Sequence, residues 1–245
     1  MAKTGRLTLD RMGFSMPVDA PAYQAPPYHY RRAEAISVRF ETDLDAALEA
    51  LPAPLELIEP ATAALSFYWY PFTTFGPYHE MILRLYAQYE GKPLTYLQQV
   101  LVDTEPPMLA GRELWGFPKK LAAISFGRER DMIYGAVERP VGFRLASVIV
   151  RPEQPMKAMA PSGPTCGLRI IPAVDGDAAR PACAEIIAAQ TEHTIIAAWE
   201  GTGSIDFAQH SALDPLDRFP VRRILKATYM EYDILLPAGR VIARL

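Results

Sequence analysis

Two adjacent lysines, Lys119 and Lys120, have the clearest potential for covalent chemistry in this sequence. They directly follow the apolar, turn-forming run WGFP in the stretch GRELWGFPKKLA. Most lysine pairs lie on a hydrated surface, so this flank indicates that one of the two amines is held out of water. A lysine free in water titrates near 10.4, and only about one in 2,500 is then a neutral, nucleophilic amine at pH 7. An attacking lysine therefore needs a lower pKa.

Burial of the amine could lower its pKa. Lowering the pKa of an amine to about 7 costs its charged form roughly 4.6 kcal/mol, which lies within the range documented for full desolvation. In an extended segment Lys119 and Lys120 point to opposite faces, so we expect desolvation to outweigh the repulsion between the two charges. Phe117 and Pro118 could form the dry wall. A neutral amine here could form a Schiff base with a ketone or aldehyde, and the iminium would accept electrons from a breaking bond.

Composition and charge narrow the class of partner. The 245 residues are 50% hydrophobic, which is enough to bury a sizeable core, and the net charge of -3 provides no broad basic field for nucleic acid. No apolar run approaches the roughly 18 residues of a membrane span, and the N-terminus lacks the apolar region of a secretory signal. We therefore expect a cytoplasmic protein that binds a small molecule, with no nucleic-acid or membrane partner.

Metal and cofactor sites find little support in the sequence. Cys166 and Cys183 are too few for a disulfide framework and lack CxxC spacing. The four histidines are scattered without metal-ligand spacing, and the GTG at residues 201–203 lacks the rest of a dinucleotide fingerprint. We expect no metal and no cofactor.

The elements that must position the lysines are mostly strands. The chain has 23 prolines and 15 glycines, which break it into short pieces and exclude long helices. Alternation or β-branched enrichment predicts strands at Ile36–Phe40, Leu94–Val102, Ile133–Val137, Phe143–Val150, Leu168–Ile171, Thr194–Trp199 and Ile234–Leu245, the last with a break at Pro237.

Two short helices complete the expected fold. One is predicted between a cap at Thr42 and a stop at Pro52, and another near Ser211–Asp217, although Pro215 weakens it. We place the lysine pair at the edge of a strand or turn begun by Pro118. The expected class is α+β, mainly antiparallel β, with a closed barrel or cone-like sheet core that encloses the site and a few short covering helices. Residues 1–245 are expected to form a single domain.

The lysine segment also resembles a known signature. GRELWGFPKKLA is similar to the motif of acetoacetate decarboxylases, with GRE, two variable residues, a small residue, an aromatic and then Pro-Lys-Lys-Leu. The resemblance extends upstream to FGPYHE and to Asp103, Glu105 and Pro106. It continues downstream through RIIPAVDG, AAWEGTG and DILLPAGRVI, so it spans nearly the whole chain.

The resemblance implies roles for individual residues. Lys119 matches the Schiff-base lysine and Lys120 the adjacent cation that helps to lower its pKa; an activated lysine of this kind in acetoacetate decarboxylase is a standard example of nucleophile activation. Glu80 matches an active-site glutamate that could shuttle a proton, and Glu113 could orient the lysines or pair with Arg112. We expect Tyr78, Trp115 and Phe117 to contact the substrate, and by resemblance a homo-oligomer.

The sequence also departs from the family. Ala33 stands where the decarboxylases carry a first-strand arginine that receives the substrate carboxylate. In an extended strand Arg31 shares the face of Ala33 and Arg32 faces away, so Arg31 is the expected substitute, with a solvated arginine as the alternative. A second acidic residue of the family falls on Leu65 or Ser66, within or beside the aromatic run SFYWYPF, which could be core or a reshaped pocket floor.

Three functions remain open from these observations. The first is a Schiff-base lyase that decarboxylates acetoacetate or a related 3-oxo acid through a lysine iminium. The second is an aldolase-dehydratase that condenses pyruvate with an aldehyde through the same lysine, because the missing charges would change how a keto acid is oriented. The third is a non-catalytic small-ligand binding barrel in which Lys119 only pairs with an anion.

Overall fold

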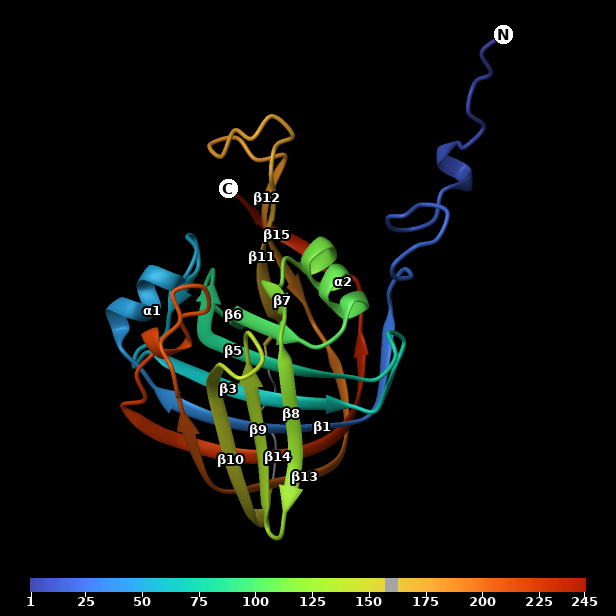
Figure 1. Cartoon of the computed structure of the whole chain (residues 1–245). Coiled ribbons are helices and arrows are strands. Elements are labelled where there is room, and N and C mark those ends of the chain that lie inside the picture. Colours follow the sequence, from blue (N-terminus) through green and yellow to red (C-terminus); the bar gives the residue numbers. More distant parts are fainter. Residues whose placement is uncertain (157–162) are drawn as a thin grey trace.

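The fold is built mainly from antiparallel strands, as Figure 1 shows for the computed structural model of the chain. The structure describes residues 1–156 and 163–245. Within these ranges there are two α-helices, α1 (Leu44–Ala50) and α2 (Glu105–Trp115), and two 3-10 turns, at Leu9–Arg11 and Leu216–Arg218. The expected class, α+β with mostly antiparallel β, is confirmed.

The strands join one 15-stranded sheet. Their bounds are β1 Tyr28–Glu41, β2 Glu56–Leu57, β3 Thr62–Tyr70, β4 Phe72–Thr73, β5 Tyr78–Tyr89, β6 Lys92–Val102, β7 Lys119–Leu121, β8 Ala123–Glu129, β9 Met132–Glu138, β10 Arg144–Pro155, β11 Thr165–Ile171, β12 Cys183–Ala189, β13 Glu192–Asp206, β14 Arg223–Leu236 and β15 Arg240–Arg244. The main ladder runs β15-β12-β11-β6-β5-β3-β1-β14-β13-β10-β9-β8. Among the described residues, the only parallel pairs of the sheet are β6 with β11, within this ladder, and β6 with β7, beside it.

The sheet curves back over itself. Figure 1 shows β8, β9 and β10 crossing the long curved strands β1, β3 and β5. An apolar cluster that includes Ile36, Leu65, Leu83, Val137 and Val148 fills the space between these two parts. In the described ranges β15 and β8 are the two ends of the ladder, so the expected closed barrel is not confirmed.

The opposite face of the curved strands holds the site. Side chains alternate between the faces of a strand, so on β5 Met81 and Leu83 enter the apolar core whereas Glu80, Ile82 and Arg84 face the other way. On β3 the same alternation turns Tyr68 and Tyr70 toward that second face. The sheet thus separates a dry core from a pocket lined by aromatic and charged groups.

Both short helical predictions need correction in detail. The α1 helix forms where expected, but Asp43 rather than Thr42 is its cap, because the Asp43 carboxylate accepts a hydrogen bond from the Ala46 amide at 3.0 Å. The helix predicted near Ser211–Asp217 is reduced to the 3-10 turn at Leu216–Arg218, since Pro215 has no amide hydrogen to donate.

Helix α2 was not expected from the sequence, although it contains the whole GRELW segment. It has prolines in its first turn, where their missing amide hydrogens cost nothing, and ends at Gly116 in the left-handed region (φ 66°). This sharp ending turns the chain directly into β7. The lysine pair therefore begins a strand, as predicted.

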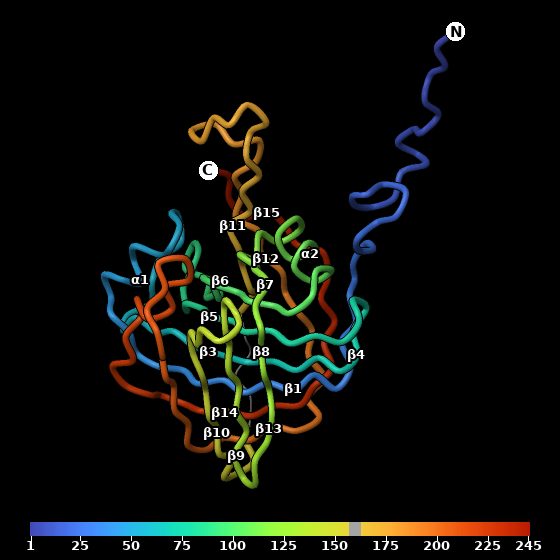
Figure 2. Tube along the Cα trace, viewed as in Figure 1, coloured from blue at the N-terminus to red at the C-terminus, as the bar shows by residue number. Residues whose placement is uncertain are grey.

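The N-terminal segment leads away from the sheet, as the blue part of the trace in Figure 2 shows. It becomes anchored at Tyr23, which is buried and donates a hydrogen bond to Glu113 of α2. Among the described residues, no helix combines the length and apolar character required to span a membrane.

Candidate active site

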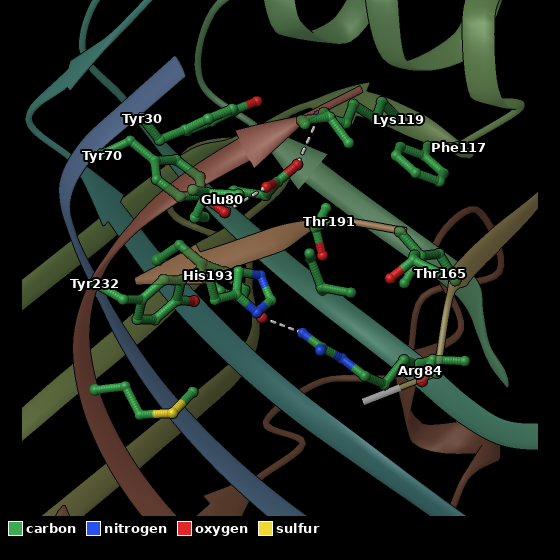
Figure 3. A pocket seen from close by; sticks show the side chains of 18 of the residues that line it. Tyr30, Tyr70, Glu80, Arg84, Phe117, Lys119, Thr165, Thr191, His193 and Tyr232 are labelled. Carbon is green, nitrogen blue, oxygen red and sulfur yellow. Dashed lines mark hydrogen bonds and ion pairs between the residues drawn. The ribbon is translucent and has the colours of Figure 1, made fainter. Parts of the chain in front are cut away.

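A pocket of about 210 Å³ lies on the second face of the sheet. Its walls come from β1, β3, β5, β6, β7, β11, β13 and β14, with Phe117 from the turn that precedes β7. Figure 3 shows the labelled lining residues Tyr30, Tyr70, Glu80, Arg84, Phe117, Lys119, Thr165, Thr191, His193 and Tyr232. Strands far apart in the chain therefore supply one mixed surface of aromatic, cationic and acidic groups.

Lys119 and Glu80 form a buried pair in this pocket. The Lys119 Nζ atom lies 2.7 Å from Glu80 Oε1, and the two residues are only 6% and 4% exposed. A charged pair this dry gains its attraction at the cost of desolvating both groups. Moving one proton from the ammonium to the carboxylate leaves two neutral partners, so this arrangement can generate a nucleophilic amine without creating a net charge.

The backbone around Lys119 fixes where its amine points. Gly111 of α2 packs directly on the lysine side chain, since a Cβ atom there would lie 2.6 Å from Lys119 Cδ. Arg112 donates a hydrogen bond to the Lys119 carbonyl oxygen at 3.1 Å, and β7 pairs with β6 so that Lys119 lies beside Val100. The first two residues of the GRE element thus position the lysine from behind.

Tyr70 and Tyr78 complete the surroundings of the pair. The Tyr70 hydroxyl donates a hydrogen bond to Glu80 Oε2 at 3.1 Å, and burial followed by the Glu80 charge raises the Tyr70 pKa well above its usual value. The phenol therefore stays protonated and remains a donor. The Tyr78 ring centroid lies 5.8 Å from Lys119 Nζ, and its hydroxyl bonds to that of Tyr30 at 3.3 Å.

Lys120 lies on the opposite side of β7. Its Nζ atom contacts Asp214 Oδ1 at 2.8 Å and the Leu213 carbonyl oxygen at 2.7 Å. Arg139 and Gln99 bind the same carboxylate, which is almost completely buried. Burial by itself would raise the Asp214 pKa, but the bonds from Lys120 and Arg139 lower it below its usual value.

Two further residues expected in the site support it from behind. Glu113 accepts a hydrogen bond from Tyr23, and among the described residues no hydrogen bond or ion pair joins it to either lysine or to Arg112. Trp115 is 1% exposed, donates to the Pro237 carbonyl oxygen at 3.2 Å and stacks on Phe117. Phe117 itself lines the pocket, and Trp115 backs it.

Arg31 does not reach the pocket. A β-bulge between Tyr30 and Ala33, with Arg32 at φ 53°, breaks the simple alternation on which its predicted position depended. Its side chain is 55% exposed and pairs with Asp233 at 2.8 Å. The expectation for Arg31 is therefore corrected, whereas Ala33 is fully buried in the cluster behind the pocket, opposite Tyr232.

The two candidate positions for the missing acidic residue also lie outside the pocket lining. Leu65 belongs to the apolar core, and the Ser66 hydroxyl bonds to Ser37 at 2.7 Å. Tyr68 and Tyr70, three and five positions after Leu65, do line the pocket. The aromatic run is therefore a pocket wall on one face and core on the other.

Sequence reasoning missed several polar residues of the lining, among them Arg84, His193 and Tyr232. Arg84 follows Glu80 at a spacing of four on β5, so strand alternation could have placed it on the pocket face. Tyr232 comes from β14, which pairs with β1 and so lies about 200 positions after its partner Ala33, and His193 comes from β13, which pairs with β14. Nothing local in the sequence indicates that contact.

The comparisons with known proteins agree with this geometry. The family model described as acetoacetate decarboxylase (ADC) matches residues 15–245. The chain belongs to the acetoacetate decarboxylase family. Curated relatives include the acetoacetate decarboxylase of Ralstonia nicotianae, which is 32% identical over 244 residues that cover 96% of each chain. The family predicted from the lysine signature is thus confirmed.

Solved structures show the same fold in this family. The crystal structure of acetoacetate decarboxylase from Legionella pneumophila matches with a TM-score of 0.88 at 28% identity, covering 100% of this chain and 99% of that one. The enduracididine biosynthesis enzyme MppR, complexed with the condensation product of pyruvate and imidazole 4-carboxaldehyde, matches with a TM-score of 0.82 at 20% identity, covering 98% and 99%. At that identity the second likeness is one of fold alone.

Proposed function

We propose that this acetoacetate decarboxylase family member is a Schiff-base lyase that decarboxylates a small 3-oxo acid, with acetoacetate as the first candidate. The observation that supports it is the pair of Lys119 and Glu80, buried together inside a pocket. In the proposal Lys119 is the nucleophile, Glu80 holds and returns its proton, and Tyr70 holds Glu80. Lys119 and Glu80 also lie in the segments GRELWGFPKKLA and FGPYHE, by which the sequence resembles the family.

The reaction follows from these atoms. When the shared proton lies on Glu80, the neutral Lys119 amine attacks the ketone carbon, and loss of water from the carbinolamine gives an iminium. The bond between the carboxylate and its neighbouring carbon then breaks, its electron pair enters the iminium, and CO2 and an enamine are formed. Protonation of the enamine carbon and hydrolysis by water release the ketone and the free lysine.

Substrate tests separate the proposed function from its alternatives. Incubation of the protein with acetoacetate should release CO2, whereas pyruvate with an aldehyde should give an unsaturated oxo acid only if the protein is an aldolase-dehydratase. Borohydride reduction with a keto acid should add the ligand mass to the peptide that contains Lys119. A protein left unmodified by every carbonyl compound tested would overturn both enzymatic functions and favour a binding module.

We also propose that residues 1–245 act as one catalytic domain within a cytoplasmic homo-oligomer. The extended N-terminal segment presents Leu9 and Met16 to solvent, and the strands β13 and β14 expose Ile195, Ile196 and Ile224. Apolar groups gathered on an arm and a sheet face are typical of contacts between copies. Sedimentation of the purified protein tests the assembly, and a strictly monomeric species would contradict it.

A further inference from the structure

Arg84 forms a second charged group in the pocket, separate from the Lys119 and Glu80 pair. It projects from β5 into the cavity, and in Figure 3 its guanidinium points inward, toward His193. Its terminal nitrogen donates a hydrogen bond to the Tyr68 hydroxyl. The site therefore has a reactive pair and, elsewhere in the same cavity, a cation.

The charge of Arg84 is not neutralised within the protein. Across the part of the chain that the structure describes, no carboxylate lies within ion-pair distance of its guanidinium. Its Nε atom is buried and has no hydrogen-bond partner among the described residues. A buried donor on a permanently charged group is costly to leave unsatisfied, so a planar acceptor with negative charge would fit it.

The position of Arg84 brings this charge near the reactive pair. In the ladder of β3 and β5, Tyr68 lies opposite Glu80, and Ala64 lies opposite Arg84. Glu80 and Arg84 are four residues apart, about 13 Å along the strand. Because the Arg84 head group bonds to Tyr68, it must reach back along the strand toward the Glu80 end.

The neighbouring groups leave the guanidinium as the anion site. Partial burial and then the charge of Arg84 lower the pKa of His193, so the imidazole is mostly neutral at pH 7 and does not add a competing charge. Burial raises the pKa of Tyr232 well above its usual value, and the phenol stays neutral. Thr165 and Thr191 add neutral hydroxyls to the same lining.

We propose that Arg84 binds the carboxylate of the keto acid while Lys119 captures its ketone carbon. This inference rests on the proposed function and adds the residue that selects acids over neutral ketones. It also explains how the pocket can bind the substrate more tightly than the product: once CO2 has left, the ketone has no carboxylate to bind the guanidinium. Arg84 lies on β5, whereas Ala33, which stands where the decarboxylases carry their arginine, lies on β1.

Matched ligands test the proposal directly. The probes are 4-oxopentanoate and 2-pentanone, two five-carbon methyl ketones of which only the first has a carboxylate. We expect borohydride trapping on Lys119 to reach half its maximum at a lower concentration of the acid. In Arg84→Gln this concentration should rise about 10- to 100-fold for the acid, the usual effect of losing a charged hydrogen bond, and change less than about twofold for the ketone.

Enzyme kinetics provide a second readout. With acetoacetate, Arg84→Gln should raise KM much more than it lowers kcat, because the lost contact binds the ground state as well as the transition state. Arg31→Gln is the matched control, since it removes a surface arginine that is already paired with Asp233. Arg84→Lys and Tyr68→Phe extend the test if the glutamine variant does not fold. Both should weaken trapping of the acid but not of the ketone. Arg84→Lys loses the forked guanidinium that can bind a carboxylate through two nitrogens, and Tyr68→Phe loses the hydroxyl that holds the guanidinium in place.

The outcomes separate the two proposals. Equal effects on acid and ketone, or none on either, would overturn the role of Arg84 while the trapped Lys119 still supports the lyase. Failure of wild-type Lys119 to trap any carbonyl compound would overturn the lyase. In that case calorimetric binding of 4-oxopentanoate to wild type and Arg84→Gln still decides the anion site, and equal affinities would reject it.

Discussion

Lys119 and Lys120 are neighbours in the chain, yet their amines end on opposite sides of β7. Lys119 reaches Glu80 at 2.7 Å inside the pocket, and Lys120 reaches Asp214 at 2.8 Å outside it. The two ammonium groups are therefore each neutralised by a different carboxylate. The two amines therefore lie in different environments, one buried beside Glu80 and the other partly exposed beside Asp214.

Lys120 is therefore expected to act by holding β7 in place. We predict that Lys120→Met lowers the free energy of unfolding by about 1–2 kcal/mol, because a charged hydrogen bond to Asp214 is lost from a partly exposed side chain. Lys120→Arg can still pair with Asp214 and should trap a keto acid nearly as well as wild type. Urea unfolding and borohydride trapping measure the two effects. Equal loss of trapping in both variants would contradict this prediction.

Gly111 offers a test of how α2 positions the nucleophile. We predict that Gly111→Ala lowers the rate of imine trapping about tenfold or more, because the new methyl group would lie 2.6 Å from Lys119 Cδ and displace the amine from Glu80. Alanine in a helix is intrinsically favoured over glycine by about 1 kcal/mol, so thermal stability should fall much less than activity. Gly5→Ala, with open space around its Cβ position, is the control.

We expect Glu80 to contribute to catalysis by carrying a proton rather than by filling space in the pocket. Glu80→Gln keeps the size of the side chain and can still accept from Tyr70, but it cannot take a proton from Lys119. We predict that kcat for 3-oxo acid decarboxylation falls about 10²- to 10⁴-fold, the usual contribution of a general acid or base. Steady-state kinetics with acetoacetate measure it. A variant with wild-type kcat would remove Glu80 from the mechanism.

Much of the fold and part of the site followed from local sequence patterns. Strand alternation placed most of β6, β9 and β10, and the apolar lead-in predicted that one of the two lysines is held out of water. The family resemblance pointed to Lys119, which is buried in the structure. Helix α2 was not predicted because its prolines and glycines are typical of turns, although prolines in a first helical turn are compatible with a helix. Arg31 was misplaced because a bulge cannot be read from alternation. His193 and Tyr232 join the pocket only through long-range pairing of β13 and β14.

Asp214 is expected to make stability depend on pH. Its pKa is lowered from the usual 3.8, so the stabilisation by Lys120 and Arg139 is fully present above 3.8 and is lost as the pH falls through the lower value of the folded state. We predict that Asp214→Asn is about 1–3 kcal/mol less stable than wild type at pH 6, because two cations lose their carboxylate. The difference should shrink below pH 3.8 as wild type also loses this charge.

Urea unfolding between pH 6 and pH 3 measures this difference in stability. The control is Asp131→Asn, which removes a carboxylate from an exposed pair with Arg151 and should change stability little. A stability gap that stays constant over this range would show that the carboxylate charge is not the cause.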